Sequence, residues 1–377
     1  MPNIMKYLEF RGDLTFKQDE LNEIDKIILA RFSYLPFKEI KLDKKDTIKN
    51  IANKMKELSI EKFIWKEDKE FIEELGKTER YKDLRVTDYK EVFDLQAEKQ
   101  FAAVTIWLPN RIKYISFRGT DMSIVGWKED FNMSFMQHIP SQQEAVKYLN
   151  EIGSRYIGKF IIGVHSKGGN LAMYSTLHIR EEIFDNIIKV YCFDAPGISE
   201  EIKDLDEAKR RFKKIIGFTP QTAIIGRLFK HLEKDIVISS TSNGLYQHDL
   251  LSWEVEVNKF KRLDSRDNDS IYIENKITKM LESMSPIVKE EFVEIGYGLF
   301  MRTKSQTLTD LANKKNQLVK EYVTIKKEER KILEKTLSEL ILDKVFIRNI
   351  LYAIRETFGK TKEKKKYIKD NENKKRN

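Results

Sequence analysis

Apolar residues recur at helical spacing over the first 85 residues. The first stripe should form a helix that ends before Pro36, and it comprises Leu21, Ile24, Ile27, Ile28 and Phe32. A second stripe runs from Ile48 to Leu58, with Asp46 placed to cap it, and a charged third segment ends at Gly76. Such stripes are typical of core packing, so we assign no chemistry to residues 1–85.

From residue 91 the pattern changes to short apolar runs. Runs at 101–108 and 112–117, separated by Pro109–Asn110–Arg111, predict a hairpin. The later runs predict strands at 160–164, 187–193, 215–218 and 236–239, and helices are expected at 143–156, after Ser166, at 202–212 and at 223–232. This alternation predicts an α/β fold with a mostly parallel sheet and helices on both faces. In such sheets the active site lies at the carboxyl ends of the strands.

Beyond Trp253 the pattern is helical again. Two amphipathic stripes run along residues 273–284 and 333–354, and Gly359 is a plausible cap. We therefore divide the chain into an α/β domain over 1–255, a helical extension over 256–358 and a tail over 359–377. Packing on the core is the favoured role for the extension; pairing with another subunit or lying on a membrane are the alternatives.

The composition indicates a protein with a sizeable core from a reducing compartment. The sequence has 377 residues, of which 41% are hydrophobic, so a sizeable core can form. Its single cysteine, Cys192, excludes a disulfide framework and fits a reducing compartment. Because the first residues lack an apolar stretch of signal-peptide length, we expect a cytoplasmic protein.

The formal net charge of +9 is partly carried by the tail, Gly359–Asn377. That segment has little to bury and should be disordered, and its lysines could contact an anionic membrane peripherally. Nucleic-acid binding is not expected, since no basic stripe interleaved with aromatic residues accompanies the charge. Histidine and cysteine spacing matches no metal site, and we expect neither a metal nor a cofactor.

The segment Lys159–Ala172, KFIIGVHSKGGNLA, reads as strand, tight turn and helix with Ser166 at the turn. This is the order of a serine-nucleophile elbow, in which small residues such as Gly168 and Gly169 must pack around a strained serine. The N–H of Lys167 would then point at a developing oxyanion. Val164 stands where the usual G-x-S-x-G pattern has its first glycine. The alternative is an ordinary strand-to-helix turn.

A serine nucleophile needs a base and a carboxylate. Among the five histidines, His248 lies in a loop after the last predicted strand, where a hydrolase of this chain order places its base. His165 adjoins Ser166 but should point to the opposite face of the strand. Asp194, which closes the strand after the elbow helix, is the favoured carboxylate, with Asp249 as the alternative. The turn Gly119–Thr120 can supply a second oxyanion N–H through Thr120.

Five motifs in this order resemble the Mbeg1-like family, which comprises bacterial relatives of the class 3 lipases in the α/β-hydrolase group. They are FRGTD, GWKEDF, HSKGGNLA, FDAPG and QHDLLSW, and the opening LEFRGDLTF is also similar. The resemblance covers roughly residues 5–255. It implies an α/β-hydrolase fold, with Ser166 as nucleophile, His248 as base and Thr120 near the oxyanion. Class 3 lipases place their aspartate after a later strand, where this chain reads Gly217–Phe–Thr–Pro–Gln–Thr without an acid.

The leading hypothesis is a serine hydrolase that cleaves a small-molecule or lipid ester through an acyl-enzyme on Ser166. The alternative is a non-catalytic protein of hydrolase fold that binds partners through the helical extension and basic tail.

Overall fold

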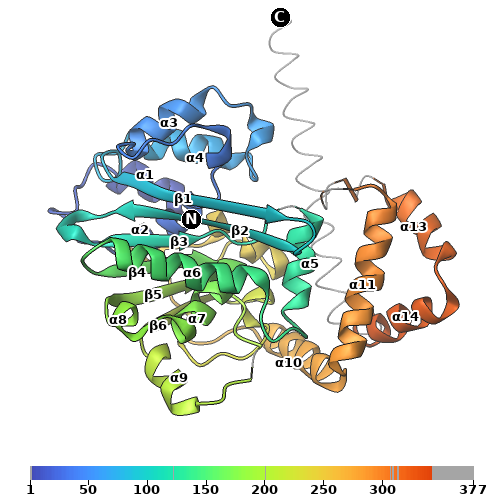
Figure 1. Cartoon of the computed structure of the whole chain (residues 1–377). Coiled ribbons are helices and arrows are strands. Elements are labelled where there is room, and N and C mark those ends of the chain that lie inside the picture. The colour runs from blue at the N-terminus through green and yellow to red at the C-terminus, as the bar shows by residue number, and fades with distance from the viewer. Residues whose placement is uncertain are drawn as a thin grey trace, which may run out of the picture.

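The computed structural model describes residues 2–341 except 122, 200, 306, 308–309 and 312–313. A seven-stranded sheet in sequential order forms its centre (Figure 1). The strands are β1 (Arg85–Asp94), β2 (Lys99–Trp107), β3 (Lys113–Phe117), β4 (Phe160–His165), β5 (Ile187–Phe193), β6 (Ile215–Pro220) and β7 (Lys234–Ile238). The first three pair antiparallel and the last five pair parallel. The predicted hairpin and the mostly parallel sheet are confirmed.

Strand β1 was not expected from the sequence. Its pairing with β2 shifts register between Thr87 and Lys90, and Asp88 there has a φ of 53°. Most of the strand is only partly buried because it forms an edge of the sheet. A bulged, half-exposed edge strand lacks the apolar alternation by which strands are recognised.

Helices cover both faces of the sheet. One apolar core contains residues of α1 (Ile4–Arg11), α2 (Glu23–Phe32), α3 (Ile48–Lys56) and α4 (Glu67–Leu75). The other contains residues of α6 (Pro140–Arg155), α7 (Lys167–His178), α8 (Glu181–Phe184) and α9 (Leu205–Phe212). Neighbouring strand residues divide between them: Ile161 and Phe193 join the first core, Ile162 and Cys192 the second. This two-residue alternation buries both faces of the sheet.

The N-terminal segment is fixed to the domain by buried polar contacts. Arg80 forms a bidentate ion pair with Asp25 of α2, at 2.6 and 2.5 Å. Tyr81 donates a hydrogen bond to the same carboxylate. The predicted helix over the second stripe is confirmed as α3, but Thr47 caps it in place of Asp46, which instead accepts a hydrogen bond from Lys54.

The helices of the C-terminal extension lie together to one side of the sheet, beyond α5 (Ile124–Asn132) (Figure 1). They are α10 (Asn268–Ser283), α11 (Pro286–Arg302), α13 (Lys315–Thr324) and α14 (Lys327–Ile341). A short β8–β9 pair, Val255–Glu256 with Lys259–Phe260, precedes them and places Phe260 in the first core. The part of the predicted 333–354 stripe beyond residue 341 and the basic tail, 359–377, lie outside the described residues. Within the described part, no helix is both long and apolar enough to cross a bilayer.

The helix predicted over residues 223–232 is wrong. The structure has a 3-10 turn over Ile225–Arg227, then Phe229 with a φ of 68° and a bridge from Lys230 to Ile198. Four apolar residues that produced the helical pattern instead line a cavity: Ile224, Ile225, Leu228 and Phe229. A loop that follows a cavity wall can imitate the spacing of a helix without forming one.

Gly163 in β4 gives a test of sheet packing. A Cβ on Gly163 would lie 1.6 Å from the Tyr114 hydroxyl, which donates to the carbonyl of Lys26. Gly163→Ala should therefore lower the free energy of unfolding by about 1–3 kcal/mol, because the buried tyrosine must move. Gly296→Ala in α11 is the matched control: a Cβ there would have no other described residue within 4 Å, and the change should stabilise by about 0.5–1 kcal/mol. Urea denaturation measures both, and equal effects would contradict the packing described.

Candidate active site at the carboxyl end of the sheet

Ser166 lies in the turn between β4 and α7 with φ 58° and ψ −136°. Non-glycine residues rarely adopt a positive φ, and at such sites the surrounding structure has to hold the strain. Gly168 and Gly169 make the close approach possible. A Cβ on Gly168 would lie 2.3 Å from the carbonyl oxygen of Phe117, and one on Gly169 would lie 2.1 Å from the Cβ of Ala195. The structure therefore has the backbone geometry of an elbow at the predicted position.

Val164 does not crowd this turn. Its side chain is fully buried in the second core, which also contains Ala172 and Cys192. The glycine that avoids a clash is Gly163, one residue earlier and on the opposite face of the strand, against Tyr114. The departure from G-x-S-x-G is thus accommodated by packing on the α7 side.

The structure joins His248 to Asp194. Nδ1 of His248 lies 2.6 Å from Oδ2 of Asp194, and the aspartate side chain is 2% exposed. Asp194 follows β5 directly, has a φ of 43° and donates its backbone N–H to the carbonyl of Phe218. A Cβ on Gly226 would lie 2.0 Å from Oδ1 of Asp194, so Gly226 allows the loop after β6 to close over the carboxylate.

Asp249, the alternative carboxylate, is directed elsewhere. It accepts from the backbone N–H of Leu251 and lies 3.3 Å from Nη1 of Arg31, and its side chain is 56% exposed. Asp235, at the start of β7, bonds to Thr219 and Arg227.

Thr120 and Lys167 flank the serine from two sides. The loop after β3 reaches the elbow, because a Cβ on Gly119 would lie 3.1 Å from the Cβ of Ser166. The Thr120 hydroxyl donates to Asp130 at 2.5 Å. Lys167 begins α7, so its backbone N–H is among those at a helix start that have no intrahelical partner. Its side chain is buried and bonds to Glu129 at 2.6 Å.

A cavity of about 570 Å³ opens between this turn and the helical extension. Ser166, His248, Thr120 and Lys167 all line it. The wall opposite is apolar and comes from α10 and α11; its residues include Ile277, Met280, Leu281, Met284, Phe292 and Val293. The extension thus packs over the site, as the first of its expected roles requires.

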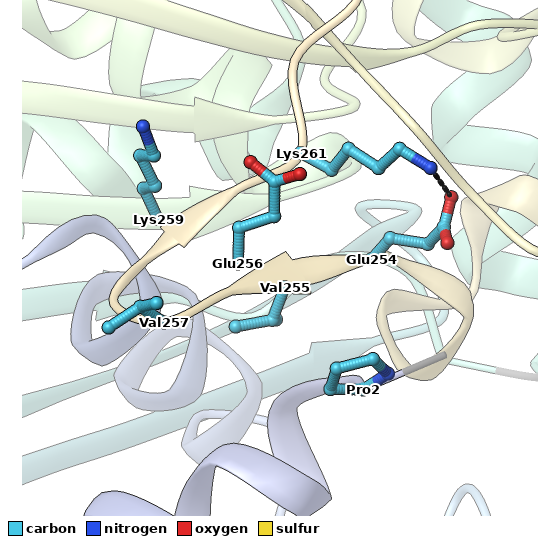
Figure 2. Close-up of a pocket in the computed structure, with 7 residues that line it drawn as sticks. All are labelled: Pro2, Glu254, Val255, Glu256, Val257, Lys259 and Lys261. Atoms are coloured by element: carbon cyan, nitrogen blue, oxygen red, sulfur yellow. Dashed lines mark ion pairs between the residues drawn. The ribbon is translucent and has the colours of Figure 1, made fainter.

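A second hollow, of about 550 Å³, lies along β8 and β9 (Figure 2). Pro2 and Val255 meet there through a backbone hydrogen bond, and Lys261 lies 3.5 Å from Glu254. Its two glutamates, Glu254 and Glu256, lie on the β8 side of the hairpin and its two lysines, Lys259 and Lys261, on the β9 side. None of the predicted catalytic residues lines it. Among the described residues no group of three or more histidine, cysteine, aspartate or glutamate side chains could hold a metal ion.

The model of the Mbeg1-like family matches residues 75–298, more than half of the chain. This chain belongs to the Mbeg1-like family. The resemblance drawn from the motifs is therefore confirmed. The mostly parallel sheet, the helices that cover it and the serine turn of this Mbeg1-like protein are those of an α/β-hydrolase-like fold. The similarity of the opening, near residues 5–75, lies outside the matched range.

Among solved structures, M37 lipase matches this Mbeg1-like chain at 18% identity with a TM-score of 0.34, covering 54% of this chain and 69% of the lipase chain. A search of curated proteins finds no match.

Three residues of the cavity were not singled out from the sequence for such a place. Tyr34 and Trp65 come from the N-terminal segment, which was assigned no chemistry, and Asp130 comes from α5. In the sequence, Asp130 stands out only as part of the GWKEDF motif. All three residues lie far from Ser166 in the sequence, so no local pattern indicates that they meet it in the fold.

Asp130 should make stability depend on pH. Burial raises the pKa of Asp130 from 3.8 to about 6, against the opposing effects of Lys167 and the Thr120 hydroxyl. The folded protein therefore binds this proton more tightly than the unfolded chain. The stabilisation is complete below about pH 4 and is lost as the pH rises through about 6.

Asp130→Asn removes this titration. Between pH 4 and pH 7, wild type should lose about 2–3 kcal/mol of unfolding free energy relative to Asp130→Asn. Urea denaturation at four pH values measures the difference. Asp264→Asn, at an exposed position, should follow wild type across the range. Parallel curves for wild type and Asp130→Asn would show that this carboxyl has an ordinary pKa.

Proposed function

We propose that this protein is a serine hydrolase that cleaves a carboxylic ester through an acyl-enzyme on Ser166. The observation that carries the proposal is that Ser166, in a strained turn, lines the same cavity as His248, whose imidazole is held by Asp194. Nucleophile, base and orienting carboxylate are the three parts that acyl transfer by serine requires.

The hydrogen bond between His248 and Asp194 supports Nε2 as the nitrogen that would act as base. An ionised carboxylate only accepts, so Nδ1 of His248 carries the proton that bonds to Asp194. Nε2 is then the basic nitrogen. It would take the proton of the Ser166 hydroxyl as Oγ attacks the ester carbonyl, and would return it to the departing alcohol. Water then attacks the acyl-enzyme by the same route and releases the acid.

Two backbone groups would stabilise the oxyanion. The N–H of Lys167 lies at the start of α7, where the helix dipole also favours negative charge. The second donor is the N–H of Thr120, whose loop is held against the elbow at Gly119. The hydrogen bond from the Thr120 hydroxyl to Asp130 orients that loop.

The cavity favours an ester with a substantial apolar acyl group, such as a lipid. Its apolar wall leaves few polar partners for a charged substrate, and its volume lies within the usual range for small-molecule sites. The single, buried Cys192 supports a reducing location such as the cytoplasm.

Fluorophosphonate labelling tests the nucleophile. Wild type should be labelled, and Ser166→Ala should not, because the probe phosphonylates only an activated serine hydroxyl. Asp194→Asn should lower kcat for a p-nitrophenyl ester on the order of 10³–10⁴-fold, since the imidazole loses its orienting charge. Ser134→Ala is the matched control: Ser134 lines the same cavity and should leave labelling unchanged. A folded wild type that resists the probe would favour the non-catalytic binding protein.

Acyl-chain preference tests the apolar wall. Met280 of α10 lines the cavity, whereas Met301 of α11 is 45% exposed. Met280→Trp should reduce kcat/KM for a p-nitrophenyl octanoate about 10-fold and leave the acetate ester nearly unaffected, because the larger ring occupies space for the chain. Met301→Trp should change neither. Equal losses on both esters would place the acyl chain elsewhere.

A further inference from the structure

Tyr34 occupies a central position behind the candidate active site. It follows α2, is 1% exposed and packs its ring against Trp65 and His165. Its hydroxyl lies 2.9 Å from Nδ1 of His165 and 3.3 Å from the His165 carbonyl oxygen. The loop after β3 packs directly against this hydroxyl, because a Cβ on Gly119 would lie 2.2 Å from it. One side chain thus contacts both the strand that ends at Ser166 and the loop that holds Thr120.

His165 extends this contact to a third segment. Nε2 of His165 lies 3.0 Å from the backbone carbonyl oxygen of His248. A carbonyl oxygen only accepts, so Nε2 must carry a proton. In the neutral ring Nδ1 is then an acceptor and takes the proton of the Tyr34 hydroxyl. The hydrogen bonds therefore run in one direction, from Tyr34 to His165 and from His165 to the main chain of His248.

A neutral His165 is compatible with these hydrogen bonds and with the nearby His248. Its ring lies 4.4 Å from the ring of His248, centroid to centroid. Burial first, and then the charge of His248 and of Arg31, lower the pKa of His165 well below its usual value. A neutral His165 does not repel the imidazolium that His248 forms when it takes the serine proton. The acidic groups near this cluster include Asp130, Asp194, which bonds to His248, and Asp68 and Asp249, which pair with Arg31.

We propose that Tyr34 and His165 form a positioning relay that fixes the His248 main chain relative to Ser166 and the Gly119–Thr120 loop. This inference rests on the proposed function and adds two residues that transfer no proton to substrate. Tyr34 lies outside the family-matched range of 75–298, so the N-terminal segment contributes directly to the geometry of the site. A displacement of about 1 Å in a catalytic group can cost on the order of 100-fold in rate.

Three variants test the relay through kcat and KM on a p-nitrophenyl ester. His165→Leu removes the donor to His248 and should lower kcat about 10–100-fold, with KM within about twofold of wild type. His165→Gln places an amide N–H near the position of Nε2 and should recover most of that loss. Tyr34→Phe removes the hydroxyl that orients His165 and should lower kcat by a smaller factor.

Tyr114→Phe is the matched control for Tyr34→Phe. Tyr114 is also fully buried, and its hydroxyl donates to the Lys26 carbonyl, away from the site. It should lose stability without losing kcat. Equal kcat for wild type and His165→Leu, or equal losses for His165→Leu and His165→Gln, would overturn the relay while wild type is still labelled by fluorophosphonate. An unlabelled wild type would instead overturn the proposed function, and the relay with it.

Discussion

The backbone of Ser166 is the constraint on which the rest of the site depends. A serine with a φ of 58° is strained by about 1–3 kcal/mol, and it persists only where its surroundings allow no alternative. Its N–H donates to the carbonyl of Phe193 at 3.1 Å, so β5 holds the turn from one side. The close approach of Gly168 to Phe117 holds it from the other, through the end of β3. Three neighbouring strand ends thus determine where the hydroxyl lies.

A buried ion pair between Lys167 and Glu129 also holds the serine turn in place. Nζ of Lys167 lies 2.6 Å from Glu129, and both side chains are 1% exposed or less. The other oxygen of Glu129 accepts from the backbone N–H of Ser141, at the start of α6. Removing Lys167 would leave the buried Glu129 without its ion-pair partner, which typically costs about 3–5 kcal/mol. The pair therefore fixes α5, α6 and the elbow in one relative position, which specifies geometry more than it adds stability.

The sequence was sufficient to predict the strands β2 to β7 and the main residues that meet at their carboxyl ends. Strand ends in a parallel sheet meet at one edge, so Ser166, Asp194 and the Gly119–Thr120 turn could be placed together from strand order alone. His248 followed from chain order. The choice between Asp194 and Asp249 could not be made from their spacing, because it depends on how the loop after β7 folds back. The structure directs Asp194 to the imidazole and Asp249 to Arg31 and solvent.

What the sequence could not predict is how segments distant in the chain build the cavity. The apolar stripe of α10 has the spacing of a core-facing helix, and nothing in that spacing distinguishes a core from a cavity wall. In the structure Ile277, Met280 and Met284 of this stripe face the cavity that Ser166 lines. The 223–232 segment was misread for the same reason, because its apolar residues form the wall as a loop.

The residues in and behind the cavity come from both inside and outside the family-matched range. Ser166, His248 and Thr120, together with Asp194 behind them, fall within the family-matched range, whereas Tyr34, Trp65 and Thr336 of the cavity wall fall outside it. Ser166, Asp194 and the Gly119–Thr120 turn sit at strand ends of the sheet. The cavity walls come from helical segments before and after the sheet and from the 224–229 loop between β6 and β7. A change in the flanking helices can therefore alter the shape of the cavity without moving the serine, because the strain at Ser166 is held by β3 and β5. Within this fold, the strand ends fix the position of the serine, and the flanking segments shape the cavity that it lines.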